Sequence, residues 1–417
     1  MQNKIELMSP AGSYESLMAA IKAGTNAVYF GVGKLNMRAR SAKNFQIDDL
    51  PTIARICSHD QISCYLALNS ILYDDEIAEM QNLCDAAKDA GVSAVIASDI
   101  SAINYASSIG LEVHISTQLN VSNLEAVKFY ARYADVIVLA RELKIGQIKS
   151  ICDEIKRQDI RGPGGNLVRI ELFIHGALCV SISGKCYMSD SLTGHSANRG
   201  ECLQTCRRSY KVVDDVTGDE LLIDNQYVMS PKDLCTIRFV DKLIECGATV
   251  FKIEGRGRRE DYVYRVTRAY RQAIDSYYAG TFSAEITQQW EEELAKVFNR
   301  GFWHGGYYMG RHINDWSKSY GSRAKKQKVY AGYVKNYFSK ARVAEFVIEN
   351  GEVKIGDELM ITGVTTGFVE ITTESMYVND VPADSAAKGD FVTIPVGEKV
   401  RRNDKLYLII DRVDFQE

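Results

Sequence analysis

Short apolar segments recur along the N-terminal two thirds of the chain, and a polar turn and an amphipathic helical pattern follow most of them. Near the start, Ser13 is placed to cap a helix and Gly24 to end it. Apolar strands that alternate with helices are typical of a parallel sheet covered by helices. We expect strands at residues 5–8, 27–30, 63–68, 94–97, 113–115, 136–139, 169–174 and 249–253.

Eight strands with intervening helices predict a closed (β/α)8 barrel of the TIM type, with a doubly wound open sheet as the alternative. We assign residues 1–325 to this α/β domain, with a Cys-rich loop inserted after the seventh strand. From residue 326 the pattern changes to alternating apolar and polar residues, with turn signals at Asn350–Gly351 and Gly356–Asp357. Residues 326–417 are therefore predicted to form a separate small all-β barrel.

Polar residues follow the predicted strands, where a barrel places its active site. Any one of them could be a capping or solvated residue, but together they predict a mouth lined for a polar or anionic ligand. His175 and Glu254 are our candidates for catalytic proton transfer. The residues in these turns are Ser9, Gly12, Asn36, Arg38, Arg40, Asn69, Ser98, Asp99, Ser116, Gln118, Asn120, Arg141, Glu142, His175, Glu254 and Arg256. Those predicted to contact substrate are Arg38, Asn69, Gln118, Arg141 and Arg256.

Four of the ten cysteines fall within residues 171–206, and a fifth, Cys235, follows that stretch. Thiolates are soft ligands that select zinc or iron–sulfur clusters, so this density predicts a metal centre. The alternative is that they are buried thiols, which suits the five scattered cysteines better. No pair of CxxC motifs is present, and the irregular spacing favours an iron–sulfur cluster over zinc. Five cysteines compete for four ligand positions: Cys179, Cys186, Cys202, Cys206 and Cys235.

The net charge of -4 means that any nucleic-acid binding must come from local basic patches. Arg265, Arg268 and Arg271 share one face of a predicted helix, either as a solvated surface or as a phosphate-contacting stripe. The first residues lack the apolar region of a secretory signal, and no apolar run is long enough to span a bilayer. A cytoplasmic protein with no membrane partner is therefore expected. HExxH, GxSxG and P-loop motifs are absent.

The segment ELFIHGALCVSISGKC, residues 171–186, resembles the motif E-x-F-x-x-G-A-L-C-x4-G-x-C of the collagenase-like peptidase family U32. The segments LMSPAGSYESLMAAIKAG, HISTQLN, YVMSPKDLC and FKIEGRGRREDY are also similar to that family, so the resemblance covers residues 4–410. Within the family, the chain looks most like the branch that hydroxylates tRNA. The resemblance implies oxygen-independent, prephenate-dependent formation of 5-hydroxyuridine at the wobble uridine, with a [4Fe–4S] cluster. Other activities in the family are proteolysis and hydroxylation of an rRNA cytidine or a ubiquinone precursor.

The resemblance also implies roles for particular residues. The cluster ligands are expected to be Cys179, Cys186, Cys202 and Cys235, with Cys206 as an alternative because one relative uses a CxxxC pair. Prephenate is expected to lie against Arg38, Arg141 or Arg256, because guanidinium groups pair with carboxylates through two hydrogen bonds. The expected partners are tRNA and an electron-transfer protein. GRGRREDY replaces the GRMKSPEY type of the family, so substrate contacts there are expected to differ.

Overall fold

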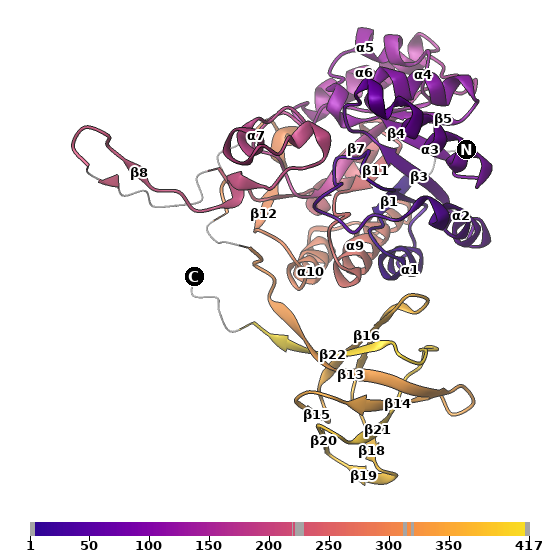
Figure 1. Cartoon of the computed structure of the whole chain (residues 1–417), viewed down its shortest axis with the longest axis vertical. Coiled ribbons are helices and arrows are strands. Elements are labelled where there is room, and N and C mark those ends of the chain that lie inside the picture. The colour runs from indigo at the N-terminus through magenta and orange to yellow at the C-terminus, as the bar shows by residue number, and fades with distance from the viewer. Residues whose placement is uncertain (1–4, 219, 222–228, 312–314, 318–320, 413–417) are drawn as a thin grey trace.

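The computed structural model describes residues 5–218, 220–221, 229–311, 315–317 and 321–412 (Figure 1). All eight predicted strands form, and each pairs in parallel with the next. The last of them, β11, pairs with both β7 and β1, which closes the ring. The predicted (β/α)8 barrel is confirmed and the open sheet is excluded. Its strands are β1 Glu6–Pro10, β2 Ala27–Gly31, β3 Ser63–Leu68, β4 Ala94–Ala97, β5 Glu112–Ile115, β6 Val136–Val138, β7 Arg169–Gly176 and β11 Val250–Ile253.

Helices surround the barrel, and the first of them begins where its capping signal predicts. Ser13 Oγ accepts a hydrogen bond from the amide of Ser16 at 3.3 Å, and Gly24 follows the first helix with a φ of +87°. None of the described helices is long and apolar enough to cross a membrane. The helices around the barrel are α1 Tyr14–Lys22, α2 Leu50–His59, α3 Ile77–Asp89, α4 Ile100–Ser108, α5 Leu124–Tyr130, α6 Ile145–Arg157, α8 Val240–Glu245, α9 Glu260–Tyr278 and α10 Ala284–Ala295.

The two ends of the barrel interior differ in chemistry. At the end where the strands begin, Glu6 accepts hydrogen bonds from Arg169 at 2.6 Å and from Tyr65 at 2.7 Å. These groups satisfy one another and close that end. Above them lies a layer of buried side chains, and a pocket opens at the ends of the strands. The buried layer consists of Met8, Ala27, Tyr29, Tyr65, Ala94, Ile96, Val136 and Val250.

An irregularity in the pairing of β7 with β11 determines which side chains face the pocket. Lys252 pairs with Phe173, but the next residue, Ile253, pairs with His175, so β7 carries one extra residue. Past this bulge, two further strands extend the sheet. β10 Asp233–Cys235 pairs antiparallel with β7, and β12 Phe302–His304 pairs with β10.

The chain between β7 and β10 forms the predicted Cys-rich insertion. It contains α7 Met188–Thr193 and then a hairpin of β8 Val212–Val213 and β9 Glu220–Leu221, which projects from the body of the molecule (Figure 1). The sequence of residues 210–229 predicts a hairpin with its turn near Thr217–Gly218, and Gly218 has a φ of +78°. The remainder of the predicted hairpin, residues 222–228, lies outside the described residues.

The C-terminal domain is all-β, as predicted. Its antiparallel sheet runs in the order β17-β16-β22-β13-β14-β21-β18-β19, and β15 pairs with β20. Among the described strands β17 and β19 do not pair with each other, so the sheet is open rather than a closed barrel. The strands are β13 Lys326–Phe338, β14 Val343–Ile348, β15 Glu352–Lys354, β16 Glu358–Gly363, β17 Gly367–Thr372, β18 Met376–Val378, β19 Val381–Ala383, β20 Ser385–Ala387, β21 Phe391–Pro395 and β22 Lys405–Asp411.

The C-terminal domain packs against the barrel through α1 and α9. Phe368 stacks on Tyr264 of α9 with ring centroids 4.5 Å apart. Arg265 forms ion pairs with Glu293 of α10 and with Glu370 of β17, which ties the two domains together. Arg271 pairs with Asp275 at 2.6 Å, and Arg268 donates to the Tyr264 hydroxyl. The predicted arginine stripe of α9 therefore makes contacts within the protein and helps to hold the two domains.

Candidate functional site

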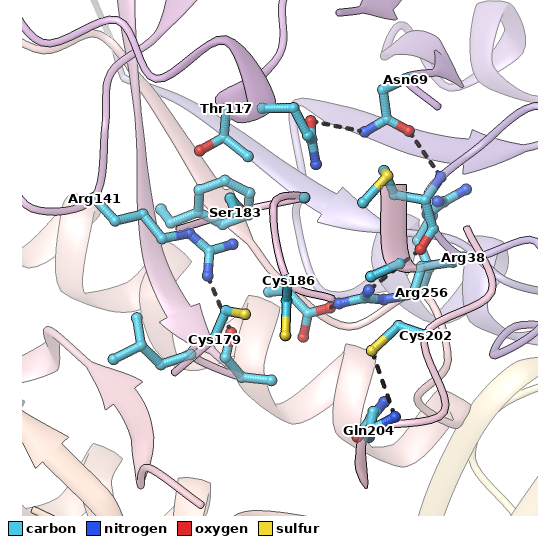
Figure 2. A pocket seen from close by; sticks show the side chains of 18 of the residues that line it. Arg38, Asn69, Thr117, Arg141, Cys179, Ser183, Cys186, Cys202, Gln204 and Arg256 are labelled. Carbon is cyan, nitrogen blue, oxygen red and sulfur yellow. Dashed lines mark hydrogen bonds and ion pairs between the residues drawn. The ribbon is translucent and has the colours of Figure 1, made fainter. Parts of the chain in front are cut away.

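A pocket lies at the carboxyl ends of the barrel strands, and residues of the Cys-rich loop form part of its lining (Figure 2). Its volume of about 150 Å³ suits a small organic molecule or a single nucleobase. All five residues predicted to contact substrate line it, together with Glu254. The structure therefore brings together side chains that follow five separate strands, β2, β3, β5, β6 and β11.

Amide side chains connect the loops on one side of the pocket. Asn69 accepts from the amide of Met37 at 3.1 Å and donates to Ser116 at 3.3 Å and to Gln118 at 3.4 Å. These bonds link the ends of β2, β3 and β5. The Gln118 carbonyl also accepts from Ser116. These side-chain amides thus hold the loops at the rim of the pocket in place, and their remaining hydrogen-bond donors and acceptors are available to a polar ligand.

Glu254 and Arg38 form an ion pair at 2.8 Å in the wall of the pocket. Burial pushes the Glu254 pKa upward, but Arg38 and Arg258 outweigh it and lower the pKa to about 2. Burial opposes ionisation of Arg38 as well, and Glu254 nevertheless raises the Arg38 pKa. At neutral pH Glu254 is therefore a carboxylate that accepts hydrogen bonds, which leaves it poorly suited to act as a general acid.

Arg256 is buried, and the backbone at Gly31 and Gly12 lies close to it. Its Nη2 donates to Asn36 at 2.9 Å, while Nη1 has no partner among the described residues. A Cβ added to Gly31 would lie 2.1 Å from Nη1, and one added to Gly12 would lie 2.1 Å from the Arg256 carbonyl oxygen. Burial lowers the Arg256 pKa to about 10, which still leaves it charged at neutral pH. Two glycines therefore make room for a buried guanidinium with an unused donor.

Two further arginines contribute positive charge. Arg141 places its guanidinium 4.1 Å from the centre of the Phe173 ring and donates to the Ala177 carbonyl at 3.3 Å. Arg207 donates to the carbonyl oxygens of Leu178 and Pro231. Within the described part of the chain, neither these two nor Arg256 forms an ion pair with a carboxylate. The pocket therefore has an excess of positive charge and suits an anion.

Four thiols line the pocket: those of Cys179, Cys186, Cys202 and Cys206. Figure 2 shows the first three on the side facing away from Asn69 and Thr117, and Cys202 Sγ accepts from the amide of Gln204 at 3.4 Å. Burial raises the Cys206 pKa to about 11, Arg207 opposes this, and the neighbouring thiols add to it. Grouped thiols match the donor chemistry of a soft metal centre. However, no three His, Cys, Asp or Glu side chains among the described residues lie close enough to hold one ion.

Two of the predicted site residues, His175 and Cys235, lie outside the pocket. The bulge in β7 turns His175 away from the interior, and Cys235 pairs with it on β10. Both contact Tyr270 of α9: the Tyr270 hydroxyl lies 3.3 Å from His175 Nδ1 and 3.9 Å from Cys235 Sγ. Burial lowers the His175 pKa to about 3 and raises the Cys235 pKa to about 12. These two side chains therefore pack between the sheet and its helices, and neither lines the described pocket.

Sequence analysis missed an ion pair on the floor of the pocket. Lys252 Nζ lies 2.8 Å from Glu171 Oε1, and both side chains are almost fully buried. Both residues lie within apolar segments, which by themselves predict ordinary barrel strands. The signal that could have found them is alternation, because Glu171 with Phe173 and Lys252 with Glu254 repeat with the period of one strand face.

Comparison with known proteins identifies the family. The chain is 54% identical over 405 residues to a protein named collagenase from Porphyromonas gingivalis, covering 97% of this chain and 98% of that one. It is 31% identical over 391 residues to tRNA hydroxylation protein P1 of Bacillus subtilis, covering 90% and 88%. It is 34% identical over 275 residues to a 23S rRNA 5-hydroxycytidine synthase of Escherichia coli, covering 66% and 40%. Residues 12–318 match the model of peptidase family U32, and the chain belongs to that family.

Proposed function

We propose that this protein is an RNA-modifying hydroxylase that forms 5-hydroxyuridine at the wobble position of tRNA. It uses prephenate as co-substrate and a [4Fe–4S] cluster, and it needs no molecular oxygen. The observation that carries the proposal is one small pocket lined both by four cysteines and by arginines, of which Arg141, Arg207 and Arg256 form no ion pair with a carboxylate among the described residues. Relatives named for the hydroxylation of tRNA and of rRNA cytidine support the reaction class.

The charge distribution suits a small dicarboxylate such as prephenate. Arg256 has an unused donor, and Arg141 and Arg207 bond mainly to carbonyl oxygens, so all three can accept a carboxylate partner. Arg38 is already paired with Glu254, whose negative charge disfavours a second carboxylate beside it. We therefore expect the co-substrate to bind on the Arg141 and Arg256 side of the pocket.

The thiols that line the pocket are the proposed cluster ligands: Cys179, Cys186, Cys202 and Cys206. Cys206 takes the place that the family resemblance gave to Cys235, because Cys235 faces Tyr270 on the outer side of the sheet. A bound cluster would supply one-electron redox capacity next to the anion site. The protein's own residues bind and orient the co-substrate.

The ligand set is tested by anaerobic purification with iron and sulfide analysis and an absorbance spectrum. Cys206→Ser and Cys235→Ser form a matched pair. We expect the first to lose the cluster and the second to retain it. Loss in Cys235→Ser with retention in Cys206→Ser would show that the loop rearranges to recruit Cys235. A colourless wild-type protein containing zinc would refute the iron–sulfur proposal.

The reaction is tested by incubating the full-length holoprotein anaerobically with prephenate, a reductant or electron-transfer protein, and undermodified RNA. Nucleosides from separated tRNA and rRNA pools are then measured by mass spectrometry. We expect 5-hydroxyuridine in tRNA only when prephenate is present. 5-Hydroxycytidine in rRNA instead would identify the rRNA activity, and hydroxylation of a ubiquinone precursor would identify the quinone activity. Unchanged RNA with an intact cluster would refute the proposed reaction.

Proteolysis is the second candidate, because the relative at 54% identity is named collagenase. The residues that line the described pocket include serines and cysteines but no histidine that could activate them. Cleavage of gelatin by the purified protein, lost in Cys179→Ser, would favour this candidate. We expect that the purified protein does not cleave gelatin.

A further inference from the structure

We propose that Lys252 binds the ketone of a 2-oxo acid as an imine, with Glu171 as its proton carrier. The inference rests on the proposed function in one respect: prephenate contains such a ketone beside one of its carboxylates. The proposal deepens that function by naming the group that recognises the keto acid. It requires no metal and no redox step.

Geometry places the amine where a ligand could reach it. Lys252 lies on β11 and lines the pocket, and its strand partner Phe173 lies on β7. Its Nζ is 4.6 Å from the centre of the Tyr29 ring and 5.5 Å from that of Phe173. The Arg141 guanidinium lies 4.1 Å from the same Phe173 ring. A cation for the carboxylate and an amine for the neighbouring ketone therefore adjoin one aromatic surface.

Electrostatics argue that this pair has a function beyond packing. Replacing a buried ion pair with apolar residues often leaves a protein equally stable, because burying the two charges costs their hydration energy. Glu171 is fully buried, and its second oxygen, Oε2, has no partner among the described residues. Burial lowers the Lys252 pKa, Glu171 opposes this, and Arg256 and Arg141 add to it. These surroundings increase the fraction of neutral amine, the form that attacks a carbonyl carbon.

The proposed step balances in atoms and charge. Lys252 gives a proton to Glu171, and the Nζ lone pair forms a bond to the ketone carbon while the C=O π electrons move to oxygen. A second proton passes from Nζ to that oxygen and gives a carbinolamine. Glu171 returns its proton to the hydroxyl, which leaves as water, and a protonated imine remains. Hydrolysis reverses each step, so Lys252 is regenerated.

The test traps the imine in the full-length wild-type protein. The protein is mixed with pyruvate, reduced with sodium borohydride, digested and mapped by peptide mass spectrometry. We expect one reduced adduct on Lys252, none with lactate, which has no ketone, and little on the exposed Lys185. Absence of the Lys252 adduct, or labelling of Lys185 to the same extent, would overturn the proposal.

Variants separate this role from a structural one. Lys252→Arg keeps the charge but should abolish trapping, and Glu171→Gln should slow trapping by roughly 10²-fold, as expected for loss of a general acid–base group. Circular dichroism establishes whether each variant is folded. If a variant is unfolded, the trapping experiment on the wild-type protein decides the proposal. A Lys252 adduct without RNA hydroxylation would refute the proposed function alone. RNA hydroxylation without any adduct would refute the imine alone.

Discussion

The glycines beside Arg256 give a quantitative test of how the pocket is built. In Gly31→Ala the new Cβ would lie 2.1 Å from Arg256 Nη1, 2.6 Å from Asn44 Oδ1 and 3.0 Å from Asn36 Cγ. Carbon atoms normally stay about 3.5 Å or more from such neighbours, so the guanidinium must shift by more than an ångström. That shift would break the 2.9 Å hydrogen bond from Arg256 to Asn36.

The expected cost follows from the contact that is lost. A hydrogen bond to a charged group contributes about 1.5–3 kcal/mol, and overpacking a filled site costs about 1–3 kcal/mol. Because both figures describe the same displaced side chain, they are not summed. We expect Gly31→Ala to lower the free energy of unfolding by about 2 kcal/mol and to weaken prephenate binding.

Urea unfolding followed by circular dichroism measures this cost, and Gly146→Ala is the matched control. Gly146 lies on α6, and an added Cβ meets nothing within 4 Å. The free energy of unfolding of Gly146→Ala should equal that of the wild type or exceed it by less than about 1 kcal/mol, because alanine favours a helix more than glycine does. A Gly31→Ala protein with the wild-type urea midpoint and wild-type prephenate affinity would refute the packing argument.

Two further results are expected. Phe368→Ala removes the ring that stacks on Tyr264 between the domains, and it should cost up to about 3–5 kcal/mol in thermal unfolding; the exposed Phe338→Ala should cost much less, and equal losses would contradict the interface. Because the folded pKa of Glu254 is depressed from 4.5 to about 2, its pairing with Arg38 stabilises the fold fully above about pH 4.5 and is lost as pH falls towards 2. Glu254→Gln should therefore lose less stability than wild type between about pH 5 and pH 3 in urea titrations, and parallel losses would contradict this.

The barrel strands could be predicted because they are short apolar runs that alternate with helical patterns. Ser13 and Gly24 bracket the first helix by local chemistry alone, and the strands on either side need only burial. The side chains at the mouth followed from the same reasoning, because parallel strands end at one edge of a barrel. Arg38, Asn69 and Arg256 meet there although they are distant in the chain.

His175 and Cys235 could not be placed this way because their orientation depends on pairing. Simple alternation would put His175 on the same face as Phe173, but the bulge shifts it to the face of Ile253. No local pattern in ELFIHG marks that extra residue. The ion pair of Lys252 with Glu171 also depends on two strands becoming neighbours when the barrel closes.

The contact of the C-terminal domain with α1 and α9 has a consequence for biosynthesis. These two helices follow β1 and β11, the first and last strands of the ring, and those strands form its closing pair. Gly367 approaches α1 so closely that an added Cβ would lie 2.8 Å from Met18 Cβ. A ribosome releases β17, which carries Gly367, after both β1 and β11 have emerged. The pairing of β1 with β11 therefore lacks its cover from the C-terminal domain until β17 has emerged, and chaperones can bind there during that interval.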